Sequence, residues 1–167
     1  MKKIIKTITG LFLFLLIILN CTTSNPSTSY KTLVEKYVDI WNTGNFTEAE
    51  TILHPDFELR MTPKFEAEKG IQAFKESVMK WREAYPDFHI ELHEIVYDIN
   101  AVAARWTITA TNTGPGMNPP TGKHVEVMGM SIVHFSDNKL KDEWIASNSL
   151  YWLMQLGYTL QPPFENK

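Results

Sequence analysis

The stretch AARWTITATN, residues 103–112, alternates apolar and polar side chains without interruption. One face carries Ala104, Trp106, Ile108, Ala110 and Asn112, and the other carries Arg105, Thr107, Thr109 and Thr111. A period of two residues is typical of a β-strand with one face turned to the core. We therefore place a strand of the fold here.

Further strands are predicted on both sides of this one. Phe88 to Ile99 alternates at first, and the slip near Glu94 and Ile95 indicates a β-bulge. After a Gly/Pro-rich loop from Gly114 to Lys123, residues 125–135 and 140–150 form two more strands. Asp137 and Asn138 between them suit a tight hairpin turn, so these strands pair antiparallel.

Helices are expected before the strands. The first ends at Gly44, the second begins at a Thr47–Glu50 capping box and ends at Pro55, and the third ends at Pro86. The third carries its apolar stripe on Ile71, Phe74, Val78, Trp81 and Tyr85. A short apolar helix from Leu150 to Leu156 follows the last strand. Helices followed by antiparallel strands favour an α+β fold, with helices packed on a curved sheet that encloses a pocket.

Composition limits the class of protein. The chain has 167 residues, of which 44% are hydrophobic, enough for the core of one domain. Its formal net charge is −3, which offers no basic surface for nucleic acid.

The N-terminus has the pattern of an export signal. Lys2, Lys3 and Lys6 precede an apolar run from Leu11 to Leu19, which is shorter than a bilayer span. Cys21 follows and resembles the lipidated cysteine of bacterial lipoproteins, although Asn20 departs from the preferred small residue. We predict a signal peptide over 1–20, a lipidated cysteine and polar tether over 21–29, a domain over 30–157 and a tail over 158–167. An uncleaved signal anchor is the alternative, and both place the protein at the cell envelope.

Seven short motifs occur in the order of a known family. They are Trp41-Asn42-Thr43-Gly44-Asn45, Pro55-Asp56-Phe57, Tyr85-Pro86-Asp87-Phe88, Arg105-Trp106, Pro119-Pro120-Thr121-Gly122-Lys123, Glu143-Trp144 and Gln155-Leu156-Gly157. In this order they resemble the SnoaL-like polyketide cyclases, also called ester cyclases. The resemblance implies the cone-shaped nuclear transport factor 2-like fold. It also implies cyclisation or isomerisation of a hydrophobic, carbonyl-bearing small molecule.

The resemblance also identifies two positions for chemistry. The family's cyclases use a pocket aspartate four residues after the tryptophan of the Glu-Trp pair, and a histidine ahead of the Pro-Pro-Thr-Gly-Lys loop. Here these positions are Asn148 and Asn112. An amide hydrogen-bonds but does not exchange a proton near neutral pH, so we expect weak or altered catalysis. The alternatives are a helix cap for Asn148 and a loop role for Asn112.

Other side chains are candidates for the site. Asp142 lies two residues before Trp144 and replaces the missing acid if it reaches the cavity; otherwise it is a solvated strand residue. The predicted ligand-facing residues are Trp144, Trp106, Trp81 and Met117, the last lying over the pocket mouth, with core packing as the alternative. His89, Glu91 and His93 share a strand face, which we interpret as solvated, and we expect no metal or cofactor.

Two functions from different classes fit these observations. The first is a cyclase-family lipoprotein that binds and transforms a small molecule. The second is a non-catalytic ligand-binding or interaction lipoprotein, which the two asparagines favour. A homodimer through the sheet face that carries Thr107, Thr109 and Thr111 is a further expectation.

Overall fold

The computed structural model describes residues 26–61, 66–116 and 119–161. Its elements, in order, are α1 (Pro26–Thr43), α2 (Ala49–Ile52), β1 (Leu53–Met61), β2 (Glu68–Lys69), α3 (Gly70–Ala84), β3 (His89–Tyr97), β4 (Ala101–Thr111), β5 (His124–Ser136), β6 (Lys139–Ser147) and α4 (Ser149–Leu156). Within the described ranges, no helix is both long and apolar enough to cross a membrane.

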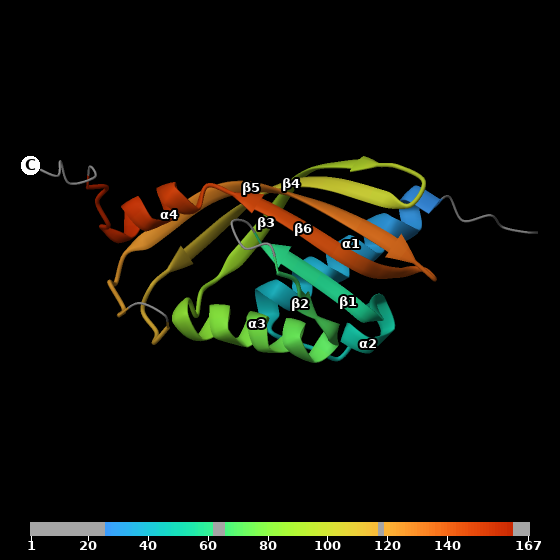
Figure 1. The fold of residues 1–167 in the computed structure, drawn as a ribbon, viewed down its shortest axis with the longest axis horizontal. Coiled ribbons are helices and arrows are strands. Elements are labelled where there is room, and N and C mark those ends of the chain that lie inside the picture. The colour runs from blue at the N-terminus through green and yellow to red at the C-terminus, as the bar shows by residue number, and fades with distance from the viewer. Residues whose placement is uncertain (1–25, 62–65, 117–118, 162–167) are drawn as a thin grey trace, which may run out of the picture.

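All the strands described belong to one six-stranded sheet in the order β2-β1-β6-β5-β4-β3. The pairs from β3 through β6 are antiparallel, as predicted, and β1 joins β6 in parallel. The sheet curves, and α1 and α3 lie on the same side of it, which leaves the other face uncovered (Figure 1). The predicted α+β architecture is therefore confirmed.

The core fills the space between helices and sheet. Phe57, Phe74 and Val78 are at most 1% exposed, and Tyr37 packs against both phenylalanine rings. The apolar stripe of α3 faces inward as its spacing predicted. Burial of such aromatic and branched side chains is the main favourable term in folding a domain with no internal disulfide.

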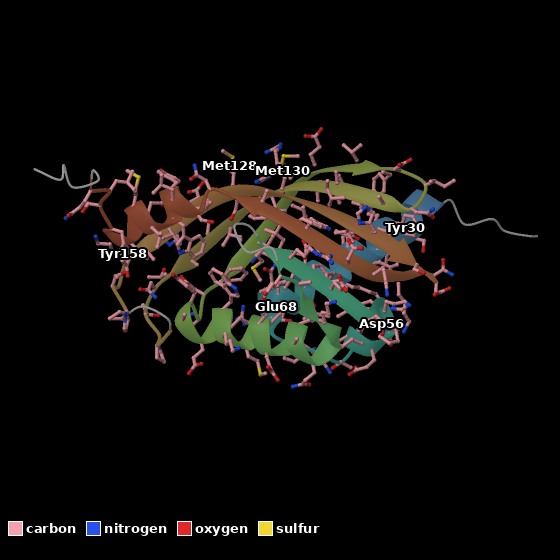
Figure 2. All side chains as sticks on the ribbon, in the orientation of Figure 1. Tyr30, Asp56, Glu68, Met128, Met130 and Tyr158 are labelled. Atoms are coloured by element: carbon pink, nitrogen blue, oxygen red, sulfur yellow. The ribbon has the colours of Figure 1, made fainter. Side chains whose placement is uncertain are left out.

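Strand β5 defines the two faces of the sheet. Its burial alternates without a break over 13 residues, with Val125, Val127 and Ser131 inside and Met128 and Met130 outside. Figure 2 shows the two methionines on the uncovered side of the sheet. A residue of β4 or β6 that pairs with an inward-facing residue of β5 therefore also faces inward, and one that pairs with an outward-facing residue faces outward.

The loop after β4 is fastened to the end of α3. The backbone N–H of Gly114 donates to the carbonyl of Ala84 at 3.1 Å. A Cβ at Gly114 would lie 1.7 Å from the carbonyl oxygen of Glu83, so only glycine allows this approach. Gly114 therefore holds the start of this loop against the end of α3.

Some local predictions were correct. The bulge in β3 occurs between Leu92 and Glu94, and the hairpin turn uses Asp137 and Asn138 with φ values of 53° and 57°. The first helix ends before Gly44, where φ is 71°.

Other local predictions were wrong. Helix α1 begins at Pro26, inside the expected tether of residues 21–29, because proline suits the first turn of a helix. Thr47 bonds Asn45 instead of capping α2, which is only four residues long. Pro55 lies inside β1, a strand that the sequence reasoning missed.

Candidate functional site

A cavity of about 720 Å³ lies between the helices and the inner face of the sheet. Most of its wall is apolar or aromatic. Helix α1 contributes Tyr37 and Trp41, α3 contributes Trp81, the sheet contributes Trp106 and Ile145, and α4 contributes Trp152 and Leu156. A cavity of this size and lining is suited to a hydrophobic small molecule.

One carboxyl group lies deep in this wall. Glu143, on β6, is 5% exposed and lines the cavity. The Tyr37 hydroxyl donates to its Oε2 at 2.5 Å, and the Ser131 hydroxyl is its second hydrogen-bond partner. The indole N–H of Trp106 donates to Ser131 Oγ at 2.9 Å. Four side chains from α1, β4, β5 and β6 thus form one buried chain of hydrogen bonds.

The surroundings of Glu143 change its acidity. Loss of water around the buried carboxyl raises its pKa, and this effect outweighs the opposing hydrogen bonds from Ser131 and Tyr37. Burial, together with the neighbouring charge of Glu143, also raises the pKa of the Tyr37 phenol well above its usual range. Tyr37 is therefore a neutral donor, and Glu143 is a stronger base than an exposed glutamate.

A bulge in β6 explains why Glu143 faces the cavity. Phe135 pairs with Leu140, but the preceding residue, His134, pairs with Asp142, so Lys141 is an extra residue. The extra residue reverses the alternation beyond it. Leu140 and Glu143 are both buried, whereas Asp142 and Trp144 turn to the outer face.

The structure contradicts the predicted roles of Asp142 and Trp144. Asp142 Oδ1 lies 2.7 Å from His134 Nδ1 on the outer face and does not line the cavity. Trp144 is 48% exposed, and the guanidinium of Arg60 lies 4.9 Å from the centre of its ring. Neither side chain reaches a ligand in the cavity.

Asn148 is a helix cap, not a pocket residue. Its exposed side chain accepts a hydrogen bond of 2.9 Å from the backbone N–H of Tyr151, at the start of α4. Asparagine is among the best residues for this position. Of the two alternatives, the capping interpretation is correct.

Asn112 is buried and lines the cavity, but its amide is occupied by the loop. Its Oδ1 accepts bonds of 2.9 and 3.1 Å from the backbone N–H and hydroxyl of Thr121. Its Nδ2 donates to the Ala84 carbonyl at 3.4 Å. Asn112 thus borders the ligand space while it holds the loop against α3.

The remaining predictions for the wall divide into three groups. Trp106 and Trp81 line the cavity, as predicted. Trp144 does not line it, and the methionines Met128 and Met130 are likewise exposed on the outer face. The predictions for Met117 at the mouth and for Cys21 lie outside the described residues.

The polar strand faces carry no metal site within the described chain. His93 Nε2 lies 2.7 Å from the hydroxyl of Thr107, its neighbour on β4. No group of three His, Cys, Asp or Glu side chains in residues 26–61, 66–116 and 119–161 is placed to bind a metal ion.

The threonine row differs from the open surface that was expected. Thr107 is only 9% exposed, and Thr111 bonds Asp87 through its backbone N–H and its hydroxyl. Exposed apolar side chains of that face include Met128, Met130, Ile132 and Trp144, on β5 and β6, and Val96 on β3.

Sequence reasoning missed Glu143, Tyr37 and Ser131 as a group. Glu143 was noted only as part of the Glu-Trp motif, and Tyr37 lies in the first predicted helix, which was not considered part of the site. The signal that was overlooked is Ser131, a polar residue on the face of β5 that otherwise carries Val125, Val127 and Val133. A hydroxyl there indicates a buried polar partner on an adjacent strand.

The buried carboxyl group can act chemically as a proton carrier. A carboxyl group with a raised pKa is able, in its ionised form, to remove a proton from a carbon next to a carbonyl and then to return that proton elsewhere. The mostly apolar wall around it is suited to holding a hydrophobic molecule next to this carboxyl group.

Known structures share this architecture. TsrD from Streptomyces laurentii aligns with a TM-score of 0.72 and 23% identity, covering 80% of this chain and 98% of that one. A SnoaL-like polyketide cyclase from Agrobacterium tumefaciens aligns with a TM-score of 0.63 and 23% identity, covering 76% and 97%. IdmH from Streptomyces antibioticus aligns with a TM-score of 0.67 and 20% identity, covering 81% and 100%.

These likenesses confirm the nuclear transport factor 2-like fold predicted from the sequence motifs. A search of curated proteins gave no significant match. The sequence model of the SnoaL-like polyketide cyclases, in contrast, matches residues 31–156, most of the chain. The chain therefore belongs to the SnoaL-like polyketide cyclase family.

Proposed function

We propose that the cavity binds a hydrophobic molecule with a carbonyl group, and that Glu143 moves a proton on it during cyclisation or isomerisation. The observation that carries this proposal is the buried Glu143 carboxyl, held by Tyr37 and Ser131 within an apolar wall. The family's acid/base position is occupied here by Asn148, an exposed cap. Glu143 supplies the titratable group from β6, the strand that precedes this cap.

The proposed step needs no further reagent. The Glu143 carboxylate takes a proton from the carbon beside the carbonyl, and the C–H electron pair moves to form an enolate. The protonated Glu143 then returns the proton to another carbon, or to the alkoxide that forms when the enolate attacks a second carbonyl. A base whose pKa is raised toward neutrality is suited to both halves of this cycle.

Proton exchange on a simple ketone tests the proposal directly. With 2-tetralone in D₂O, the wild-type protein should speed the replacement of the protons beside the carbonyl, followed by NMR. Glu143→Gln keeps the shape of the side chain and should slow exchange by roughly 100-fold or more. Asp142→Asn is the matched control, because the adjacent carboxyl faces outward. Full exchange by Glu143→Gln would contradict the proposal.

A binding protein without turnover is the second candidate. The amides at Asn112 and Asn148, where the family uses titratable groups, favour it. In that case 2-tetralone binds, seen as quenching of tryptophan fluorescence, but neither wild type nor Glu143→Gln speeds proton exchange. The two functions therefore give different results with the same ligand.

We also propose that the protein is exported and anchored by lipid on Cys21. The basic start, the apolar run and the cysteine directly after it support this proposal. Growth with an alkyne-tagged fatty acid should label the wild type and leave Cys21→Ser unlabelled and released from membranes. Labelling of Cys21→Ser would contradict it.

Self-association is proposed through the outer face of the sheet. Met130 and Ile132 on β5 lie opposite Ala146 and Trp144 on β6, which gives a joined apolar surface. Met130→Glu should convert a dimer to a monomer in sedimentation velocity, whereas Met79→Glu, an exposed methionine on α3, should not. An unchanged oligomeric state in Met130→Glu would contradict this surface.

A further inference from the structure

The charged side chains around the cavity are mostly acidic. Among the described residues of its wall, the side chains with a carboxyl or amino group are Glu66, Glu68, Glu83, Glu143 and Lys80. Glu68 lies beside Leu59 in the β1–β2 pair, and Figure 2 shows it on the helix side of the sheet. Lys80, on α3, is exposed and therefore remains in contact with water.

The inner part of the cavity has a carboxyl group with neutral partners. Glu143 is bonded by the hydroxyls of Tyr37 and Ser131, and neither carries a positive charge. The residues that pair with Glu143 on the two adjacent strands, Val133 on β5 and Leu59 on β1, are aliphatic, and both line the cavity. A negatively charged ligand group placed there would lie next to another carboxyl group and would lose its hydration.

We infer that the cavity selects hydrophobic molecules whose buried end is neutral or carries an amine, and that it rejects carboxylates, sulfonates and phosphates. Burying an anion without a cation is unfavourable, and this cost remains whichever protonation state Glu143 adopts. Within the enclosed wall an anion would therefore have to take up a proton before binding.

A neutral or cationic group meets a different environment. A ketone oxygen can accept a hydrogen bond from the protonated carboxyl group or a hydroxyl. An ammonium group can pair with the ionised Glu143, and the faces of Tyr37, Trp41 and Trp106 lie in the same wall. Aromatic faces attract cations most strongly when water is excluded.

The inference rests on the proposed function only in that the cavity accepts small molecules. Three probes that share one ring system test this selectivity. They are 2-acetylnaphthalene, 2-naphthoate and 2-(aminomethyl)naphthalene, titrated near pH 8 and followed by quenching of tryptophan fluorescence. The ketone and the amine should bind, and the carboxylate should bind at least about tenfold more weakly than the ketone. Equal or tighter binding of the carboxylate would overturn the inference.

Variants link the selectivity to Glu143. Glu143→Gln should raise the affinity for naphthoate relative to that for the ketone severalfold. Glu83→Gln, at the exposed edge of the same cavity, should leave that ratio unchanged. An unchanged ratio in Glu143→Gln would also overturn it. A protein that shows this ranking but does not exchange protons on 2-tetralone would contradict only the proposed catalysis.

Discussion

The hydroxyl of Tyr37 donates to Oε2 of Glu143 at 2.5 Å, across 106 positions of sequence. This bond joins the middle of α1 to β6 and crosses the wall of the cavity. A buried polar contact thus connects this helix to this strand at the candidate site. Both the position and the charge of Glu143 depend on this contact.

Removing the Tyr37 hydroxyl should weaken both stability and acidity. In Tyr37→Phe the ring remains packed against Phe57 and Phe74, but Glu143 loses one donor. We expect the free energy of unfolding to fall by about 1–3 kcal/mol and the pKa of Glu143 to rise further. Urea unfolding and a pH titration of proton exchange measure the two effects. A pKa that falls would show that the bond does not stabilise the ionised carboxyl.

Stability should depend on pH through Glu143. Burial raises its pKa in the folded protein above the ordinary value of 4.5. The folded state thus binds the proton more tightly than the unfolded chain. The resulting stability is complete below the unfolded pKa and is lost as pH rises through the folded pKa.

Glu143→Gln removes this contribution and provides the comparison. The melting temperature of the wild type, relative to the variant, should fall as pH rises from about 4 toward 8. Thermal unfolding of both proteins at several pH values measures it. A difference that stays constant across this range would show that the carboxyl has the same pKa in both states.

Gly129 should tolerate no larger residue. It pairs with Trp106 across β4 and β5, and a Cβ there would lie 2.1 Å from the indole ring. Gly129→Ala must displace the indole from Ser131, so we expect a loss of about 1–3 kcal/mol in unfolding free energy and an altered near-ultraviolet circular dichroism spectrum. Met128→Ala, the exposed neighbour, should change stability by less than about 0.5 kcal/mol. Equal effects of the two variants would contradict this packing.

Restoring the family's aspartate should not restore chemistry. In Asn148→Asp the carboxylate can still cap α4, whereas Asn148→Ala should cost about 1 kcal/mol through loss of the bond to Tyr151. Because this side chain is exposed and outside the cavity wall, neither variant should speed proton exchange on 2-tetralone. A gain of exchange in Asn148→Asp would show that α4 moves to bring this position inside.

Regular patterns made most of the fold predictable. The period of two in residues 103–112 and the helical stripe ending at Tyr85 each describe one element that packs on one side. Those signals depend only on residues close together in the sequence, so they can be recognised without knowing which elements pack against each other. Strand β1 was missed because a proline often ends a helix. Pro55 instead lies inside β1, between Leu53 and Glu58, where the pairing with β6 is irregular.

The site was harder to predict because it depends on which face of a strand turns inward. Asp142 and Trp144 share a face, as expected, but one extra residue at Lys141 turns that face outward. Trp106, in a strand without such an irregularity after it, was placed correctly. The role of Asn148 depends on the start of α4, where a cap and a pocket residue have the same sequence signature.

The extra residue at Lys141 also suggests how such a scaffold acquires new chemistry. Loss of that one residue would turn Glu143 to the outer face and its neighbours in sequence into the cavity, while β5 and β6 stay paired. A single codon gained or lost at the hairpin would thus exchange the inward-facing and outward-facing side chains of β6. Homologous domains that share every motif can therefore carry different reactive groups in the cavity, and a sequence alignment alone would overlook the change.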